Sequence, residues 1–130
     1  MSSNHGHGFD DRGRKSVIES LVKTWNAHDL EAFLAHLAPD YDSRWPLHPE
    51  RDFVGVEHVR ERWSGNFARM PDFRVEVLGL ATNDSDEVWV EMRWLGTLPD
   101  GSRFDQQGVI ANTVRDEKIV AARLYLESLP

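Results

Sequence analysis

The chain has 130 residues, which is the length of one ordinary domain and too few for two. Its 22 acidic and 15 basic residues give a formal net charge of −7, which argues against nucleic-acid and acidic-membrane partners, because both require a basic face. There is no cysteine, which excludes disulfides and thiol chemistry, and no apolar run near the ~18 residues of a membrane span, so a cytoplasmic location is expected. Residues 1–14 are rich in glycine, serine and charge and are predicted to form a flexible tail before a single domain over residues 15–130.

Two helices joined by a tight connection are predicted next. Ser16 and Glu19 have the spacing of a capping box, and the apolar residues that follow fall on one helical face. An earlier start, capped by Asp10 or Asp11, is the alternative. Asp29 can cap the second helix, so that the two helices form a hairpin.

A third helix is predicted further along the chain. The second helix is expected to end at Pro39, and the third to begin after Gly55 and to end at Pro71. The apolar residues of the third helix recur at helical spacing: Val56, Val59, Trp63, Phe67 and Met70.

The remaining segments read as strands. A short strand is predicted over residues 41–45, and four longer ones over 73–82, 88–97, 103–114 and 118–126. Alternation slips near Gly79, which indicates a bulge or a strand buried on both faces. Because short turns join the long strands, they are expected to be antiparallel. The predicted fold is α+β: a curved antiparallel sheet wrapped on three N-terminal helices, with a ligand cavity at its open end.

Four stretches in this order carry a family resemblance: residues 25–32 (WNAHDLEA), 53–60 (FVGVEHVR), 70–75 (MPDFRV) and 112–125. The chain resembles the nuclear transport factor 2-like superfamily, and most closely its SnoaL-like and ketosteroid-isomerase-like branch. The resemblance implies a cone-like, cystatin-like α+β fold with a pocket. It also implies a homodimer that packs through the sheet.

The resemblance places apolar residues at positions where ketosteroid isomerases carry catalytic groups. Trp45 stands at the position of a general-base aspartate, Leu21 at that of a tyrosine, and Ile110 at that of a protonated aspartate. The isomerase mechanism of the family is therefore not expected. Limonene-epoxide-hydrolase relatives use an arginine and two aspartates, and their positions here hold Glu91, Arg93 and Leu124.

Glu91 and Arg93 are the predicted catalytic pair. They share one face of their strand, while Val90, Met92 and Trp94 share the other. The resemblance turns the Glu91 face toward the cavity, where Glu91 would accept a proton and Arg93 would hold an oxyanion. The alternative interpretation is a structural ion pair on an exposed face, with Val90, Met92 and Trp94 in the core.

His48 is the third candidate catalytic residue. It lies in the loop after the first strand, near the expected pocket mouth, and a histidine there can titrate near neutral pH. The alternative is an exposed loop histidine.

The predicted ligand-binding residues combine aromatic side chains with two amides and one leucine. Aromatic residues at helical spacing are more often core, but in this fold the core wall is also the pocket wall. Gln106 and Asn112 share a strand face that the resemblance turns inward, where they would orient a carbonyl or bond each other or water. The full set is Trp25, Trp45, Trp63, Phe67, Gln106, Asn112 and Leu124.

No metal site and no cofactor motif is found in the sequence, so a cofactor-free protein is expected. The predicted function is binding of a small, largely apolar molecule, with isomerase-, cyclase- or hydrolase-like acid–base chemistry as one hypothesis. The alternative is a non-catalytic small-molecule-binding domain, or a dimeric scaffold or interaction domain. The face of Val90, Met92 and Trp94 is too apolar to stay wet, so a homodimer through the sheet is expected if helices do not cover it.

Overall fold

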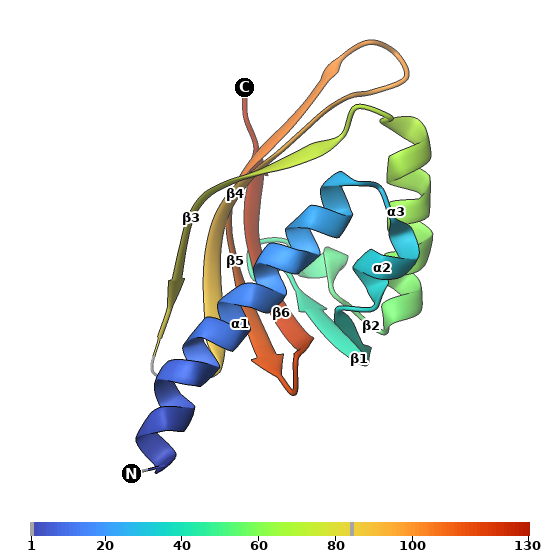
Figure 1. Ribbon diagram of the computed structural model, residues 1–130. Helices are drawn as coiled ribbons and strands as arrows, with labels where there is room; N and C mark the ends of the chain where they lie inside the picture. The colour runs from blue at the N-terminus through green and yellow to red at the C-terminus, as the bar shows by residue number, and fades with distance from the viewer. Residues whose placement is uncertain (1, 84) are drawn as a thin grey trace.

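Three helices lie across one face of a curved sheet in the computed structural model, which describes residues 2–83 and 85–130, with side chains from Arg12 onward (Figure 1). The helices are α1 (Ser2–Asn26), α2 (Leu30–Leu34) and α3 (Val56–Arg69), and a short 3₁₀ turn, η1, spans Pro49–Arg51. The strands are β1 (Leu37–Arg44), β2 (Phe53–Val54), β3 (Arg74–Thr82), β4 (Glu87–Thr97), β5 (Arg103–Arg115) and β6 (Lys118–Ser128).

The first helix is longer than predicted. Its helical backbone begins at Ser2 and passes through Ser16, so the capping-box spacing there does not mark a helix start. Flexibility of residues 1–14 stays a prediction. At the other end, Asn26 fixes the helix to the edge of the sheet: its side-chain amide donates to the Val75 carbonyl oxygen at 3.0 Å and accepts from the Val75 amide at 2.6 Å.

The second helix begins where the sequence predicts and ends earlier. The Asp29 carboxylate accepts a hydrogen bond from the Ala32 amide, which confirms the predicted cap. The helix ends at Leu34 rather than at Pro39, and Pro39 lies in β1. A proline is tolerated in this strand because β1 carries an irregularity in register between Leu37 and Asp42.

The six strands form one mixed sheet in the order β2-β1-β6-β5-β4-β3. The four long strands pair antiparallel, as predicted. Strand β1 pairs antiparallel with β2 but parallel with β6, where Ser43 is opposite Ala122. The predicted bulge is present in β3, between Val77 and Gly79.

The core lies between the helices and the concave face of the sheet. Alternate residues of β4, from Val88 to Trp94, are buried there under aromatic side chains of the helices. Trp25 of α1 and Trp63 of α3 meet with ring centroids 5.1 Å apart in an edge-to-face arrangement. Because helices of the same chain cover this face of β4, its apolar character is no longer a reason to expect a dimer.

Candidate functional site

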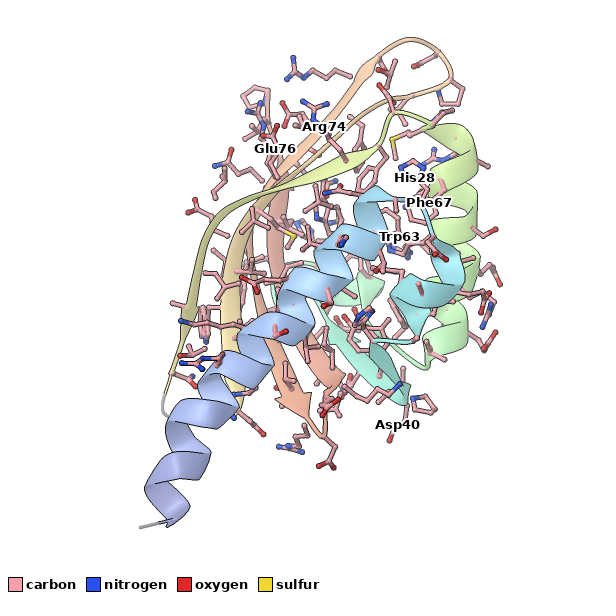
Figure 2. All side chains as sticks on the ribbon, in the orientation of Figure 1. His28, Asp40, Trp63, Phe67, Arg74 and Glu76 are labelled. Carbon is pink, nitrogen blue, oxygen red and sulfur yellow. The ribbon has the colours of Figure 1, made fainter. Side chains whose placement is uncertain are left out.

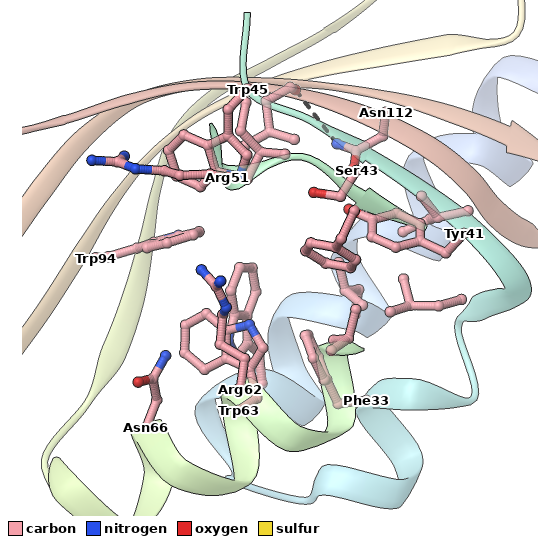
Figure 3. A pocket seen from close by; sticks show the side chains of 18 of the residues that line it. Phe33, Tyr41, Ser43, Trp45, Arg51, Arg62, Trp63, Asn66, Trp94 and Asn112 are labelled. Carbon is pink, nitrogen blue, oxygen red and sulfur yellow. Dashed lines mark hydrogen bonds between the residues drawn. The ribbon is translucent and has the colours of Figure 1, made fainter. Parts of the chain in front are cut away.

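A cavity of about 370 Å³ lies between the concave face of the sheet and the three helices (Figure 3). Eight of its 21 lining residues are aromatic, and four of the five tryptophans of the chain line it. The apolar lining residues are Leu21, Trp25, Phe33, Leu37, Trp45, Phe53, Val59, Trp63, Trp94, Phe104, Ile110, Ile119 and Leu124.

Four uncharged polar side chains lie on the sheet wall of this cavity: Tyr41, Ser43, Gln106 and Asn112. Burial raises the pKa of the Tyr41 phenol well above its ordinary value, and a hydrogen bond with Ser43 opposes this shift only in part. Tyr41 therefore stays protonated and can donate a hydrogen bond. The Asn112 amide nitrogen donates to the Val88 and Ile110 carbonyl oxygens, both at 3.4 Å, which is long for a hydrogen bond.

Arginines lie on the other part of the lining, beside η1 and α3. Arg51 stacks on Trp45, with its guanidinium carbon 4.9 Å from the ring centroid. Arg62 and Arg69 come from α3, and all three arginines line the cavity together with Asn66. Among the described residues of the lining, none is Asp, Glu or His. The cavity therefore combines an apolar interior, neutral hydrogen-bonding groups and positive charge.

Six of the predicted ligand-binding residues line this cavity: Trp25, Trp45, Trp63, Gln106, Asn112 and Leu124. Phe67 does not. Its ring stacks on His28 at 4.4 Å and packs against Trp63, behind the wall (Figure 2). It therefore supports the lining and does not form part of it.

The family model for the SnoaL-like domain matches residues 18–122. The chain belongs to the SnoaL-like domain family. A search of curated protein sequences found no match.

Solved structures place this SnoaL-like domain in the nuclear transport factor 2-like α+β fold. AclR, a putative hydroxylase from Streptomyces galilaeus, is 21% identical with a TM-score of 0.76, and 90% of each chain is covered. SalBIII, an epoxide hydrolase/cyclase-like enzyme with a role in pyran ring formation in the polyether salinomycin, is 19% identical with a TM-score of 0.80 over 91% of this chain and 93% of that one. A Mycobacterium tuberculosis protein in complex with estradiol-17beta-hemisuccinate is 20% identical with a TM-score of 0.74, over 85% and 91% of the two chains.

Glu91 and Arg93 lie on the opposite side of β4 from the cavity, so the prediction that they face it is wrong. Alternation along the strand places Val90 and Met92 in the core and leaves Glu91 exposed. Arg93 donates to both carboxylate oxygens of Asp105, at 2.9 and 2.7 Å. The alternative interpretation holds, with an ion pair on the outer face, although the partner of Arg93 is Asp105 rather than Glu91.

His48 also lies outside the lining. Its Nε2 is 2.8 Å from a carboxylate oxygen of Glu127, near the end of β6. This contact joins the loop after β1 to the last strand, and the imidazole does not reach the cavity.

The sequence contained a signal for some of the residues that were missed. Alternation along the strand predicted over residues 41–45 places Tyr41 and Ser43 on the same face as Trp45, and this face lines the cavity. Arg62 falls among the polar residues of the third helix, and no sequence pattern distinguishes it from a solvent-exposed arginine. In the part of the chain that the structure describes, no group of three acidic or histidine side chains could hold a metal ion, and no helix is long and apolar enough to cross a membrane.

Proposed function

We propose that this SnoaL-like domain binds a small, largely apolar, ring-containing molecule in its aromatic cavity. The observation that carries the proposal is the cavity itself, since about 370 Å³ lies within the range of small-molecule sites. Its tryptophan and phenylalanine rings suit a flat apolar ligand, and Tyr41, Ser43 and Asn112 would bond to an oxygen on that ligand.

The structural neighbours support this class of ligand. The Mycobacterium tuberculosis protein of the same fold holds a steroid ester, estradiol-17beta-hemisuccinate. At 20% identity the likeness concerns the fold, so the ligand class of this chain rests on its own lining residues.

Isothermal titration calorimetry with two neutral compounds, estradiol and 2-naphthylacetamide, tests the proposal. We expect saturable binding of at least one of them, with one site per chain. Trp45→Leu should weaken binding because Trp45 lines the cavity, whereas Trp89→Leu should leave it unchanged because Trp89 lies on the outer face. Absence of binding by both compounds, or an equal loss in the two variants, would contradict the proposal.

A second candidate function is catalysis by hydrogen-bond donation to a developing oxyanion. The raised pKa of Tyr41 favours it, because a phenol that stays neutral can donate to a substrate oxygen throughout the physiological pH range. The epoxide hydrolase/cyclase-like neighbour shows that the fold accommodates reactions of oxygenated substrates. Tyr41→Phe should then lower kcat on any substrate found while leaving binding of 2-naphthylacetamide within a few-fold of the original. Full activity of Tyr41→Phe would remove this candidate.

A homodimer through the sheet is also part of the proposal, with the outer face as the contact surface. Trp89 of β4 and Leu78 of β3 are 38% and 49% exposed. Sedimentation equilibrium at micromolar concentration should give twice the chain mass, and Trp89→Glu should give the monomer. A monomeric original chain would contradict the dimer and leave the cavity proposal intact.

A further inference from the structure

We infer that the ligand of this cavity is an organic anion, with its acidic group at the arginine side and its apolar body against the aromatic wall. The inference rests on the proposed function and specifies its substrate class. The whole chain is acidic, with a formal net charge of −7, yet the charged residues of the cavity lining are all arginines. The arginines give the cavity a positive electrostatic potential although the chain as a whole is negative. A positive potential raises the local concentration of anions.

The pairing of the arginines supports this inference. Seven arginines elsewhere in the described chain have a carboxylate at ion-pair distance: Arg44, Arg60, Arg74, Arg93, Arg103, Arg115 and Arg123. On the cavity side of α3, Arg62 has an aromatic neighbour, Phe53, at 5.9 Å, and Arg69 donates to Asn66 at 3.1 Å. Neither has a carboxylate partner among the described residues. Two guanidinium groups beside one cavity are thus free to bind an acid.

Two carboxylates adjoin Arg51 in the sequence, Glu50 and Asp52, and neither forms a close ion pair with it. Asp52 accepts a hydrogen bond from the Trp45 amide at 2.6 Å and lies 3.7 Å from Arg44, so its carboxylate is already engaged by these two groups. Glu50 is 69% exposed and its nearest oxygen is 4.0 Å from Arg51. An exposed pair at that separation is weak, so Arg51 retains most of its capacity to bind another anion.

The interior of the cavity fixes the orientation of such a ligand. The groups that Tyr41, Ser43 and Asn112 offer there are uncharged, and burial of an unpaired carboxylate among aromatic rings would be costly. Figure 3 shows Arg62 extending from α3 toward the cavity, with Arg51 on the facing wall. A carboxylate placed between them can accept paired hydrogen bonds from a guanidinium while the ring system fills the interior.

Matched acids and amides test the inference by calorimetry. The pairs are 2-naphthylacetic acid with 2-naphthylacetamide, and estradiol-17β-hemisuccinate with the corresponding succinamide. We expect each acid to bind about tenfold more tightly than its amide, as charge-assisted hydrogen bonds at a partly exposed site allow. Added sodium chloride should reduce the advantage of the acid and leave the amide unchanged.

Variants locate the effect. Arg62→Gln should remove most of the preference for the acid without weakening the amide, and Arg51→Gln and Arg69→Gln should each reduce it. Arg74→Gln is the matched control, because it makes the same charge change on the outer part of β3 (Figure 2). The preference should persist in that variant.

The possible outcomes separate this inference from the proposed function. Equal binding of acid and amide would overturn the inference and retain the proposed function. A preference that survives all three cavity variants, or that Arg74→Gln removes as well, would also overturn the inference, because the anion would then bind elsewhere. Absence of binding by acids and amides alike would overturn both.

Discussion

Ser43 of β1 and Asn112 of β5 are opposite the same residue, Ala122 of β6, in the two neighbouring ladders. Adjacent strands are about 4.8 Å apart, so the two polar residues stand roughly 10 Å from each other in one row across the concave face. The small side chain of Ala122 between them leaves both exposed to the cavity. A ligand with two oxygens at this spacing could bond to both residues.

Ser43→Ala should weaken binding of estradiol several-fold. The hydroxyl is buried at the cavity wall, so its removal takes away one neutral hydrogen bond, worth about 1 kcal/mol. Calorimetry on Ser43→Ala, Asn112→Ala and the double variant measures whether the two losses add, as they should for separate contacts. An unchanged dissociation constant in the double variant would show that neither residue contacts the ligand.

Trp63→Ala should destabilise the fold by about 3–5 kcal/mol, the usual cost of removing a large buried aromatic side chain. Trp63 is 6% exposed, and its ring packs within 5.4 Å of Trp25, Phe73 and Trp94 by centroid distance. The matched variant Trp89→Ala should cost less than half as much, since that ring lies on the outer face. Urea unfolding followed by circular dichroism gives both free energies, and equal costs would contradict the assignment of Trp63 to the core.

Gly108→Ala should disrupt the pairing of β5 with β6. A Cβ atom there would lie 1.9 Å from the Tyr125 carbonyl oxygen and 2.8 Å from the Leu126 Cα, so backbone would have to move. Gly65→Ala is the control: the site is on α3, a Cβ there would meet nothing within 4 Å, and alanine should stabilise the helix by about 0.5–1 kcal/mol. Thermal unfolding should therefore shift down for Gly108→Ala and up for Gly65→Ala. A Gly108→Ala protein as stable as the original would refute the close approach.

Acid should weaken the fold partly through Glu87. Its carboxylate accepts from Arg123 at 2.7 Å, from Asn83 at 3.0 Å and from Trp89 at 3.2 Å, and the Arg123 bond is the main reason that the Glu87 pKa lies below its ordinary value of 4.5. A pKa lowered by folding contributes stability above the ordinary value, and this stability is lost as the pH falls through the lowered pKa.

The measurement for Glu87 is the free energy of unfolding between about pH 6 and pH 3. The gap between the original chain and Glu87→Gln should be largest at the upper end and should close toward the lower end. Arg123→Gln should reduce the same pH dependence. A gap that stays constant with pH would exclude a contribution from this carboxylate.

Local sequence patterns predicted most of the architecture. The helical spacing around Trp63 and the alternation in the four long strands are properties of each segment alone, and the structure confirms both. The cap at Asp29 and the bulge before Gly79 were also predictable from the sequence, because each depends on a few neighbouring residues.

The residues of β4 alone did not indicate which of its two faces turns toward the core. Both faces of the strand carry large apolar side chains: Trp89 and Leu95 on one, Met92 and Trp94 on the other. Packing of the helices decides between the faces, and the family resemblance pointed to the wrong one. The structure has the alternative interpretation, in which the face of Val90, Met92 and Trp94 is buried.

The arginine side of the cavity was unpredictable for a different reason. Arg51 and Arg62 come from a 3₁₀ turn and from α3, whereas the facing part of the lining comes from β4, β5 and β6, which follow much later in the sequence. An arginine on a polar helix face looks the same whether it faces bulk water or the rim of a cavity. Tertiary contacts alone distinguish the two.

The central place of β6 has a consequence for the growing chain on the ribosome. Strand β1 is the first strand to be translated, and β6, its long partner, is the last. About 75 further residues must therefore be synthesised before β1 can pair with β6. During that interval β1 has only the two-residue strand β2 beside it, and β5 has one open edge. The nascent protein thus exposes two strand edges until Lys118–Ser128 emerges, and these edges are where a chaperone would bind and where an unfinished chain would aggregate.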